Sequence, residues 1–177
     1  MQQTFLLPRE HQAIPLGALR GHNQGALPML RSSDPAISAM LDFEHDSVLT
    51  VTEETDLETA LDAMFRLGMR IFLVVRAAAV VGVLTLQGAR RAWAGPGPRG
   101  AGRCPLRVAE VMVPCALAPA VDWTMLQQWS LGDLSEILGG AEADYLVVLE
   151  DDLTSGSRLR GLIARERVER QLRQPLG

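Results

Sequence analysis

Apolar and polar positions along the chain predict a succession of short helices and strands. Ser33 or Asp34 can cap a short helix that begins at Pro35 and runs to about Leu41. Residues 48–51 then predict a brief strand.

The next helix has apolar positions three or four residues apart, which places them on one face. These positions are Leu57, Ala60, Leu61, Met64 and Leu67. Thr55, with Glu58 three residues later, forms a capping-box pattern, in which each side chain satisfies a backbone N–H at the start of the helix. Gly68 is placed to end the helix.

Two continuous apolar segments follow, residues 71–75 and 80–84, and both are rich in β-branched side chains. Such segments are typical of strands that are buried on both faces of a sheet. Residues 89–93 predict a closing helix. The order in this half is therefore helix, strand, helix, strand, strand, helix.

The same order recurs about 72 or 73 residues later, and a longer hairpin loop between Glu150 and Arg160 raises the last spacing to 79. The pairs are Met40 with Met112; Leu61, Met64 and Phe65 with Leu134, Ile137 and Leu138; 73–75 with 146–148; and 82–84 with 161–163. Two such copies, each too small to bury its own apolar face, are expected to pack on each other about a pseudo-twofold axis.

Composition divides the chain into four parts. Residues 1–32 show no sustained period, and we expect an N-terminal extension that is partly disordered. Residues 33–94 form the first repeat, and residues 106–173 form a second, degenerate repeat. Residues 95–105 are a Gly/Pro linker; they contain a Gly-x-Gly-x-x-Gly string, but a helix precedes it where a dinucleotide site requires a strand.

The first copy resembles a cystathionine-β-synthase (CBS) domain in residues 48–51, 55–64, 73–75 and 80–85. Together with the weaker second copy, residues 34–173 resemble a tandem CBS pair, or Bateman module, of the stand-alone bacterial type. The resemblance implies an α/β (α+β) fold of two tandem β-α-β-β-α repeats packed with pseudo-twofold symmetry. It also implies a homodimer and two clefts at the junction of the repeats, which in the family often hold AMP, ATP or S-adenosylmethionine.

Family members that bind these ligands carry Gly-apolar-apolar-Ser/Thr-x-x-Asp after the last strand, where the hydroxyl meets phosphate or ribose and the aspartate accepts from the ribose hydroxyls. The first copy keeps Thr85 but has Gly88 in place of the aspartate. The second copy has Ala164 and Arg167 at these two positions. Losing a charged acceptor costs about 1.5–3 kcal/mol per hydrogen bond, which disfavours the usual ribose recognition in both clefts and leaves the first as the better candidate.

Arg167 allows two interpretations. With Arg165 and Arg170 it could hold a phosphate or carboxylate, which suit the shape of guanidinium groups. Alternatively the helix is solvated and carries weak surface pairs four residues apart, Glu166 with Arg170 and Glu169 with Arg173.

These features predict a non-catalytic regulatory or sensor module in which a small ligand at the inter-repeat cleft shifts a conformational equilibrium. The ligand would be an adenosine compound, such as AMP, ATP or S-adenosylmethionine, or another small anion; no cofactor is required. The candidate ligand-binding residues are Thr50, Arg70, Phe72 and Thr85 in the first cleft, and Tyr145, Ala164 and Arg167 in the second. The alternative is a structural dimerisation or docking protein that has lost ligand binding and docks onto a partner protein.

Composition narrows the function classes further. All 17 basic residues are arginines, so the chain has no lysine for a phosphate-binding loop, a Schiff base or a general base. A net charge of −4 argues against binding nucleic acid. With no apolar run long enough for a membrane helix and no secretory leader, we expect a cytoplasmic protein without membrane contact.

Other reactive residues predict neither a metal site nor a catalytic group. His11, His22 and His45 lack the spacing of metal ligands. Cys104 and Cys115 are expected to be free thiols in a reducing cytosol. Trp123 and Trp129 are expected either in the core or at the cleft or a dimer face.

Overall fold

The computed structural model describes residues 14–15, 28–46, 48–77, 79–95, 105–140, 144–152 and 156–172. Most of the predicted linker, residues 96–104, and most of the N-terminal extension lie outside these ranges. The chain divides into two compact units. The first-repeat unit contains Ile14–Pro15 and residues 48–118, and the second-repeat unit contains residues 28–46 and 119–172.

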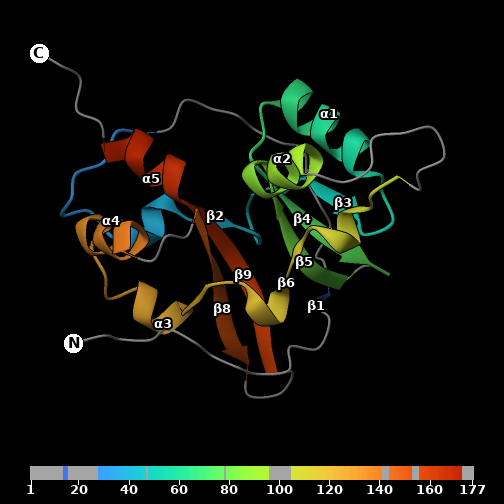
Figure 1. Cartoon of the computed structure of the whole chain (residues 1–177). Coiled ribbons are helices and arrows are strands. Elements are labelled where there is room, and N and C mark those ends of the chain that lie inside the picture. Colours follow the sequence, from blue (N-terminus) through green and yellow to red (C-terminus); the bar gives the residue numbers. More distant parts are fainter. Residues whose placement is uncertain are drawn as a thin grey trace, which may run out of the picture. The chain divides into compact units, whose positions relative to one another are not determined.

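The first-repeat unit is a mixed sheet covered by helices. Its elements are β1 (Ile14–Pro15), β3 (Thr50–Thr52), α1 (Leu57–Leu67), β4 (Ile71–Arg76), β5 (Ala79–Thr85), α2 (Leu86–Ala94), the 3₁₀ turn η2 (Val108–Glu110), β6 (Val113–Pro114) and the 3₁₀ turn η3 (Cys115–Leu117). The strand order is β1-β5-β4-β3, with β6 also paired to β5. Strands β3 and β4 are parallel, and the other pairs are antiparallel. Helices α1 and α2 cover one face of this sheet (Figure 1).

Four of the five residues in the predicted apolar stripe of α1 build the core of this unit, but the prediction is wrong for Leu67, which is 48% exposed at the end of the helix. Leu57, Ala60, Leu61 and Met64 are buried against Phe72, Val74 and Leu84 of the sheet. Leu73, which points to the opposite face of β4, is also buried, which confirms a strand buried on both faces. Gly68 ends α1 in the left-handed conformation, at φ 63°, as its position predicts.

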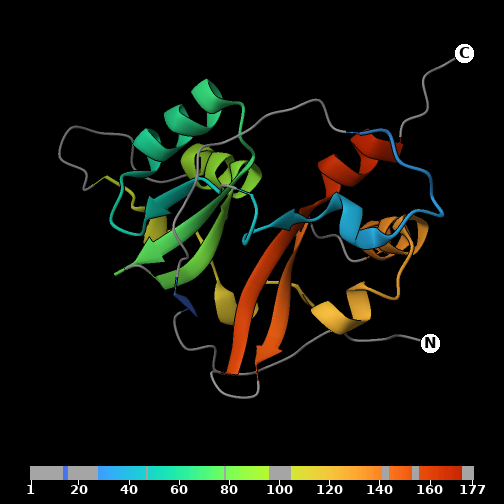
Figure 2. The same cartoon turned by 180° about the vertical axis from the view of Figure 1, so that it is seen from behind.

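The second-repeat unit repeats this plan. Its elements are η1 (Ala36–Ala39), β2 (Leu41–Asp42), β7 (Ala120–Asp122), α3 (Trp123–Leu126), α4 (Leu131–Gly140), β8 (Tyr145–Asp152), β9 (Gly156–Ala164) and α5 (Arg165–Leu172). The strand order is β2-β9-β8-β7. Figure 2 shows η1, coloured blue, beside α4 and α5. The hairpin between Glu150 and Arg160 is largely strand, because β8 and β9 extend into the segment predicted as a loop.

The predicted capping box at α1 does not form. The Thr55 hydroxyl bonds to the Thr52 hydroxyl, and the N-cap position is Asp56, whose side chain makes no capping bond. The backbone N–H of Leu57 donates instead to the carbonyl of Leu106 at 2.7 Å. A segment distant in the sequence therefore accepts a hydrogen bond from the first turn of α1. The equivalent helix α4 does have a capping box, in which the side chains of Ser130 and Asp133 each accept the backbone N–H of the other residue.

Each unit contains a segment that the sequence assigned to the other repeat. Strand β2, which precedes the first repeat's own strands, pairs with β9 in the second-repeat unit, and β6 pairs with β5 in the first-repeat unit. The methionines at the ends of these segments pack on glycines, Met40 on Gly161 and Met112 on Gly82. The repeat in the sequence pairs Met40 with Met112 and Gly82 with Gly161. In the structure these residues make the same methionine–glycine contact in each unit.

In the helices and central strands, the spacing between equivalent residues of the two repeats is one residue longer than predicted. Val74 pairs with Gly82, and Val148 pairs with Gly161, so Val74 corresponds to Val148 and not to Val147. Likewise, Leu57 and Leu131 are equivalent, because each donates its N–H to the segment that crosses the start of its helix. The spacing in these elements is 74 residues.

Candidate functional site

The first-cleft candidates lie at one end of the sheet in the first-repeat unit. Ile71 pairs with Thr85, and the N–H of Leu86 donates to the carbonyl of Arg70 at 2.7 Å. Arg70, Phe72 and Thr85 are therefore neighbours. Thr50, half buried, starts the adjacent strand β3. Phe72 is only 3% exposed and belongs to the hydrophobic core, whereas Arg70 is exposed.

Thr85, a candidate ligand-binding residue, also stabilises the start of a helix. Its hydroxyl accepts the N–H of Gly88 at 3.0 Å and so caps α2. The hydroxyl proton stays available for a ligand acceptor. A Cβ at Gly88 would lie 3.0 Å from this hydroxyl oxygen, so a side chain at position 88 would stand directly beside Thr85.

The second-cleft candidates lie at the matching end of the other sheet. Tyr145 pairs with Ala164, and α5 begins at the next residue, Arg165. Tyr145 is buried, whereas Ala164 and Arg167 are half buried. The Nε atom of Arg167 is buried and has no hydrogen-bond partner in the part of the chain that the structure describes. Burial lowers the pKa of the Arg167 guanidinium, although the carboxylate of Asp46 opposes this shift.

The other two arginines of the predicted basic trio are engaged within the protein. Arg165 donates to the carbonyl of Leu138, and Arg170 pairs with Glu166 at 2.9 Å. The predicted surface pair of Glu166 with Arg170 is thus confirmed, whereas Arg173 lies outside the described residues. Arg167 is the member of the trio with a buried, unsatisfied donor.

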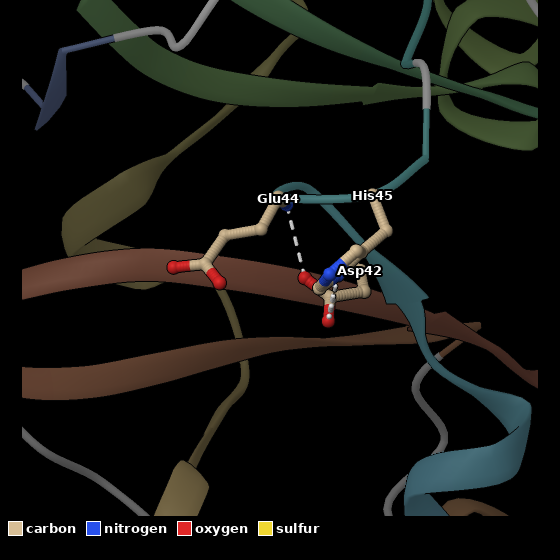
Figure 3. A group of neighbouring side chains, drawn as sticks. All are labelled: Asp42, Glu44 and His45. Atoms are coloured by element: carbon tan, nitrogen blue, oxygen red, sulfur yellow. Dashed lines mark hydrogen bonds and ion pairs between the residues drawn. The ribbon is translucent and has the colours of Figure 1, made fainter.

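At the end of β2 lies a cluster of Asp42, Glu44 and His45, which the sequence analysis did not predict (Figure 3). Asp42 accepts the N–H of Glu44 at 2.9 Å, and its second oxygen lies 3.1 Å from Nδ1 of His45. Burial raises the pKa of Asp42, but the Glu44 N–H, His45 and Arg160 outweigh it, so the pKa lies below its ordinary value.

Two arginines of β9 neutralise this cluster. Arg160 bonds to Asp42 at 3.0 Å and also to Glu44, and Arg158 lies 2.8 Å from Glu44. Arg160 also stacks on Trp123, with 5.0 Å between the guanidinium carbon and the ring centre. Because guanidinium groups occupy the carboxylates that a cation would need, we interpret the cluster as an ion-pair network that fastens β2 to β9. Trp123 and Trp129 pack against the core of the unit.

Sequence reasoning also missed a groove of about 360 Å³ between α1 and α2. Its lining residues are Glu58, Leu61, Asp62, Phe65, Arg90, Trp93 and Ala94. The signal was present in two large aromatic residues: Phe65, which lies outside the predicted apolar stripe of its helix, and Trp93, at the end of the predicted closing helix.

Comparison with solved structures defines the class of fold. The chain has the fold of CBS-domain structures, as its residues predicted. It matches the CBS domain of a bacterial CNNM/CorC-family Mg²⁺ transporter in complex with ATP, with a TM-score of 0.52, 18% identity, and coverage of 79% of this chain and 87% of that one.

Two further structures show the same likeness. A Burkholderia ambifaria protein with CBS domains, described as a candidate for signal transduction, matches with a TM-score of 0.52 and 20% identity over 74% of this chain and 89% of that one. A conserved protein of Pyrococcus horikoshii matches with a TM-score of 0.58 and 15% identity over 84% of this chain and 98% of that one. No family model and no curated protein matches the sequence. No helix among the described residues is long and apolar enough to cross a membrane.

Proposed function

We propose that the chain is a non-catalytic regulatory module of the CBS-pair type that binds a small anion, with Arg167 as its anion-binding group. The observation that carries the proposal is the buried Nε of Arg167, which has no acceptor among the described residues. A buried donor without a partner costs about 1–3 kcal/mol, and an anionic ligand would recover this cost.

The chemistry of Arg167 favours a phosphate or carboxylate. A guanidinium group presents two parallel donors to such anions and binds them more tightly than a neutral acceptor. Arg167 also stands where the CBS motif has an aspartate, so a ligand here would be held by its anionic group and not by its ribose hydroxyls. ATP in the CBS domain of the Mg²⁺ transporter makes adenine nucleotides the first ligands to test.

The test compares two arginines on the same helix. Thermal unfolding of the wild type is measured with AMP, ADP, ATP, S-adenosylmethionine and inorganic phosphate. A ligand at 100 times its dissociation constant stabilises the folded state by about 2.7 kcal/mol. We expect Arg167→Gln to abolish the shift and Arg170→Gln to preserve it, since Arg170 already pairs with Glu166. Equal loss in both variants would mean that α5 attracts anions only through its overall charge.

The first-repeat site has its own test. Gly88→Asp restores the carboxylate of the CBS motif beside the Thr85 hydroxyl, at a position whose backbone φ is not in the left-handed region. We expect this variant to gain binding of AMP and adenosine, and Gly88→Asn, which has the same size without the charge, to gain little. An identical response of the two variants would argue against ribose recognition at position 88.

A docking protein that has lost ligand binding is the second candidate function. The replacement of the motif aspartate by Gly88 in one repeat and by Arg167 in the other favours it. Unchanged melting temperatures across the whole ligand panel, in the wild type and in Gly88→Asp, would support this function and refute the first.

A further inference from the structure

Helix α5 of the second-repeat unit buries a glutamine whose side-chain amide has no partner. Gln171 is 1% exposed, and within the described residues neither its amide oxygen nor its amide nitrogen forms a hydrogen bond. Buried amide groups in proteins are normally satisfied. The unsatisfied amide of Gln171 therefore indicates a bonding group that this part of the chain does not supply.

Gln171 lies one helical turn beyond Arg167, on the same side of α5. Residues four apart on a helix are neighbours, with about 5–6 Å between their Cβ atoms. Side chains of a helix also lean toward its N-terminus, so the side chain of Gln171 leans toward the turn that carries Arg167. The buried Nε of Arg167 likewise lacks an acceptor among the described residues. Two donor atoms and one acceptor atom without partners therefore lie on one side of the helix.

The first-repeat unit has no such pair, although its fold is the same. Helices α2 and α5 begin directly after the equivalent strands β5 and β9, so Gly88 corresponds to Arg167 and Ala92 corresponds to Gln171. Neither glycine nor alanine has a polar side chain, and Ala92 packs against the core of its unit. The polar pair is therefore a property of the second repeat and not a requirement of the fold.

The unpartnered groups define the kind of ligand that suits them. The Nε of Arg167 and the amide nitrogen of Gln171 donate, so they require acceptors such as the oxygens of an anion. The amide oxygen of Gln171 accepts, so it requires a donor on the ligand. Hydrogen phosphate meets both requirements because it keeps a hydroxyl proton near neutral pH, whereas sulfate has the same shape and no proton. Since Arg167 is only half buried, part of its side chain is accessible to such a ligand.

We propose that Gln171 is a specificity-determining residue of the Arg167 site and selects an oxyanion that carries a hydroxyl group. The amide oxygen of Gln171 accepts the hydroxyl proton of the ligand, while Arg167 and the amide nitrogen donate to its anionic oxygens. Free hydrogen phosphate and a hydroxycarboxylate share this chemistry. The selectivity rests on the proposed anion-binding function of Arg167 and adds which anions the site prefers.

Calorimetric titration compares hydrogen phosphate with sulfate at neutral pH and constant ionic strength. We expect the wild type to bind phosphate about 10-fold or more tightly, which is the effect of one hydrogen bond to a charged ligand. Sulfate carries the higher charge, so a general attraction to arginines would give the opposite order. Lactate and propionate form a second pair of equal charge that differs by one hydroxyl group. This pair shows whether the site also takes a hydroxycarboxylate.

The decisive variant is Gln171→Met, which has a similar length and no amide. It should remove the preference for phosphate and raise the melting temperature of the ligand-free protein, because it removes two buried polar atoms without partners. Gln128→Met, at an exposed position of the same unit, is the matched control and should keep the preference.

The outcomes separate this selectivity from anion binding itself. A preference that survives in Gln171→Met, or equal binding within both pairs by the wild type, would overturn the role of Gln171 and leave Arg167 as an anion site. A higher melting temperature with an unchanged preference would mean that Gln171 is only a residue of the core. A wild type that binds none of the four anions would refute both the selectivity and the proposed function.

Discussion

Gly161 lies where a side chain would collide with β2 and Met40, and its replacement by alanine tests this packing. A Cβ at Gly161 would lie 2.6 Å from the carbonyl oxygen of Leu41 and 2.7 Å from the sulfur of Met40. An ordinary contact begins at 3.4 Å, so β2 would have to move by about 0.8 Å away from β9. The thioether of Met40 can bend aside, but the backbone carbonyl cannot.

The expected cost of Gly161→Ala is that of overpacking a well-filled site. Such insertions cost about 1–3 kcal/mol. For a chain of this size, 2 kcal/mol lowers the melting temperature by about 4–8 °C. Calorimetry or urea unfolding measures this directly, and the equivalent Gly82→Ala should behave similarly because its Cβ would lie 2.8 Å from Met112 and from the carbonyl of Val113.

Gly139→Ala is the matched control. Apart from the neighbouring residues and the helix backbone, no atom of the described residues lies within 4 Å of a Cβ at this exposed helical position, so alanine should stabilise α4 by roughly 0.5–1 kcal/mol. An unchanged melting temperature in Gly161→Ala, or a loss of equal size in Gly139→Ala, would refute the packing of Met40 and β2 on β9.

Three further predictions concern backbone strain and ionisation. Gly68→Ala should destabilise the protein by about 1 kcal/mol in urea unfolding, because Gly68 has φ 63°, whereas Gly68→Asn should lose less. Ala77→Gly should stabilise it by roughly 0.5–1 kcal/mol in the same assay, because Ala77 has φ 46°; a loss of stability would contradict the left-handed turn. The pKa of Asp42 is lowered by folding, so its stabilising effect is complete above the pKa of the unfolded chain and is lost as the pH falls through the folded value. The stability advantage of the wild type over Asp42→Asn should therefore shrink in acid melts, and a constant advantage at every pH would rule out this linkage.

The sequence predicts most accurately those elements whose signals are local. The apolar stripe of α1 and the left-handed end at Gly68 follow from side-chain spacing within a few turns of helix. The two continuous apolar segments become β4 and β5 within one or two residues of the predicted limits. The residues that define each of these elements lie within the element itself. The periodicity of apolar positions was therefore sufficient to locate it.

Predictions that depended on distant partners were less accurate. The pattern of Thr55 and Glu58 is a reasonable capping box, yet the carbonyl of Leu106 takes the N–H of Leu57. The repeat alignment was wrong by one residue in the helices and central strands because leucine-rich segments match in either register. The strand partners of Gly82 and Gly161, together with the backbone donors Leu57 and Leu131, fix the correct register.

For the candidate sites too, the sequence could not predict features that depend on distant parts of the chain. The sequence placed Arg167 at the motif position but could not show that its Nε is buried without an acceptor, since that depends on the packing around α5. It likewise grouped Phe72 with the ligand-binding residues, whereas the side chain lies in the core. The groove residues Phe65 and Trp93 come from helices whose relative position the sequence does not give.

The exchange of segments explains why the repeat in the sequence is not the unit of packing. Strand β2 and Met40 precede the first repeat's strands but complete the sheet of the second-repeat unit. Strand β6 and Met112 lead into the second repeat but complete the sheet of the first-repeat unit. A cut between the repeats would therefore remove from each sheet a short strand and the methionine that packs beside it. Gly82 and Gly161, on which these methionines pack, therefore belong to the exchange of segments as much as the two strands do.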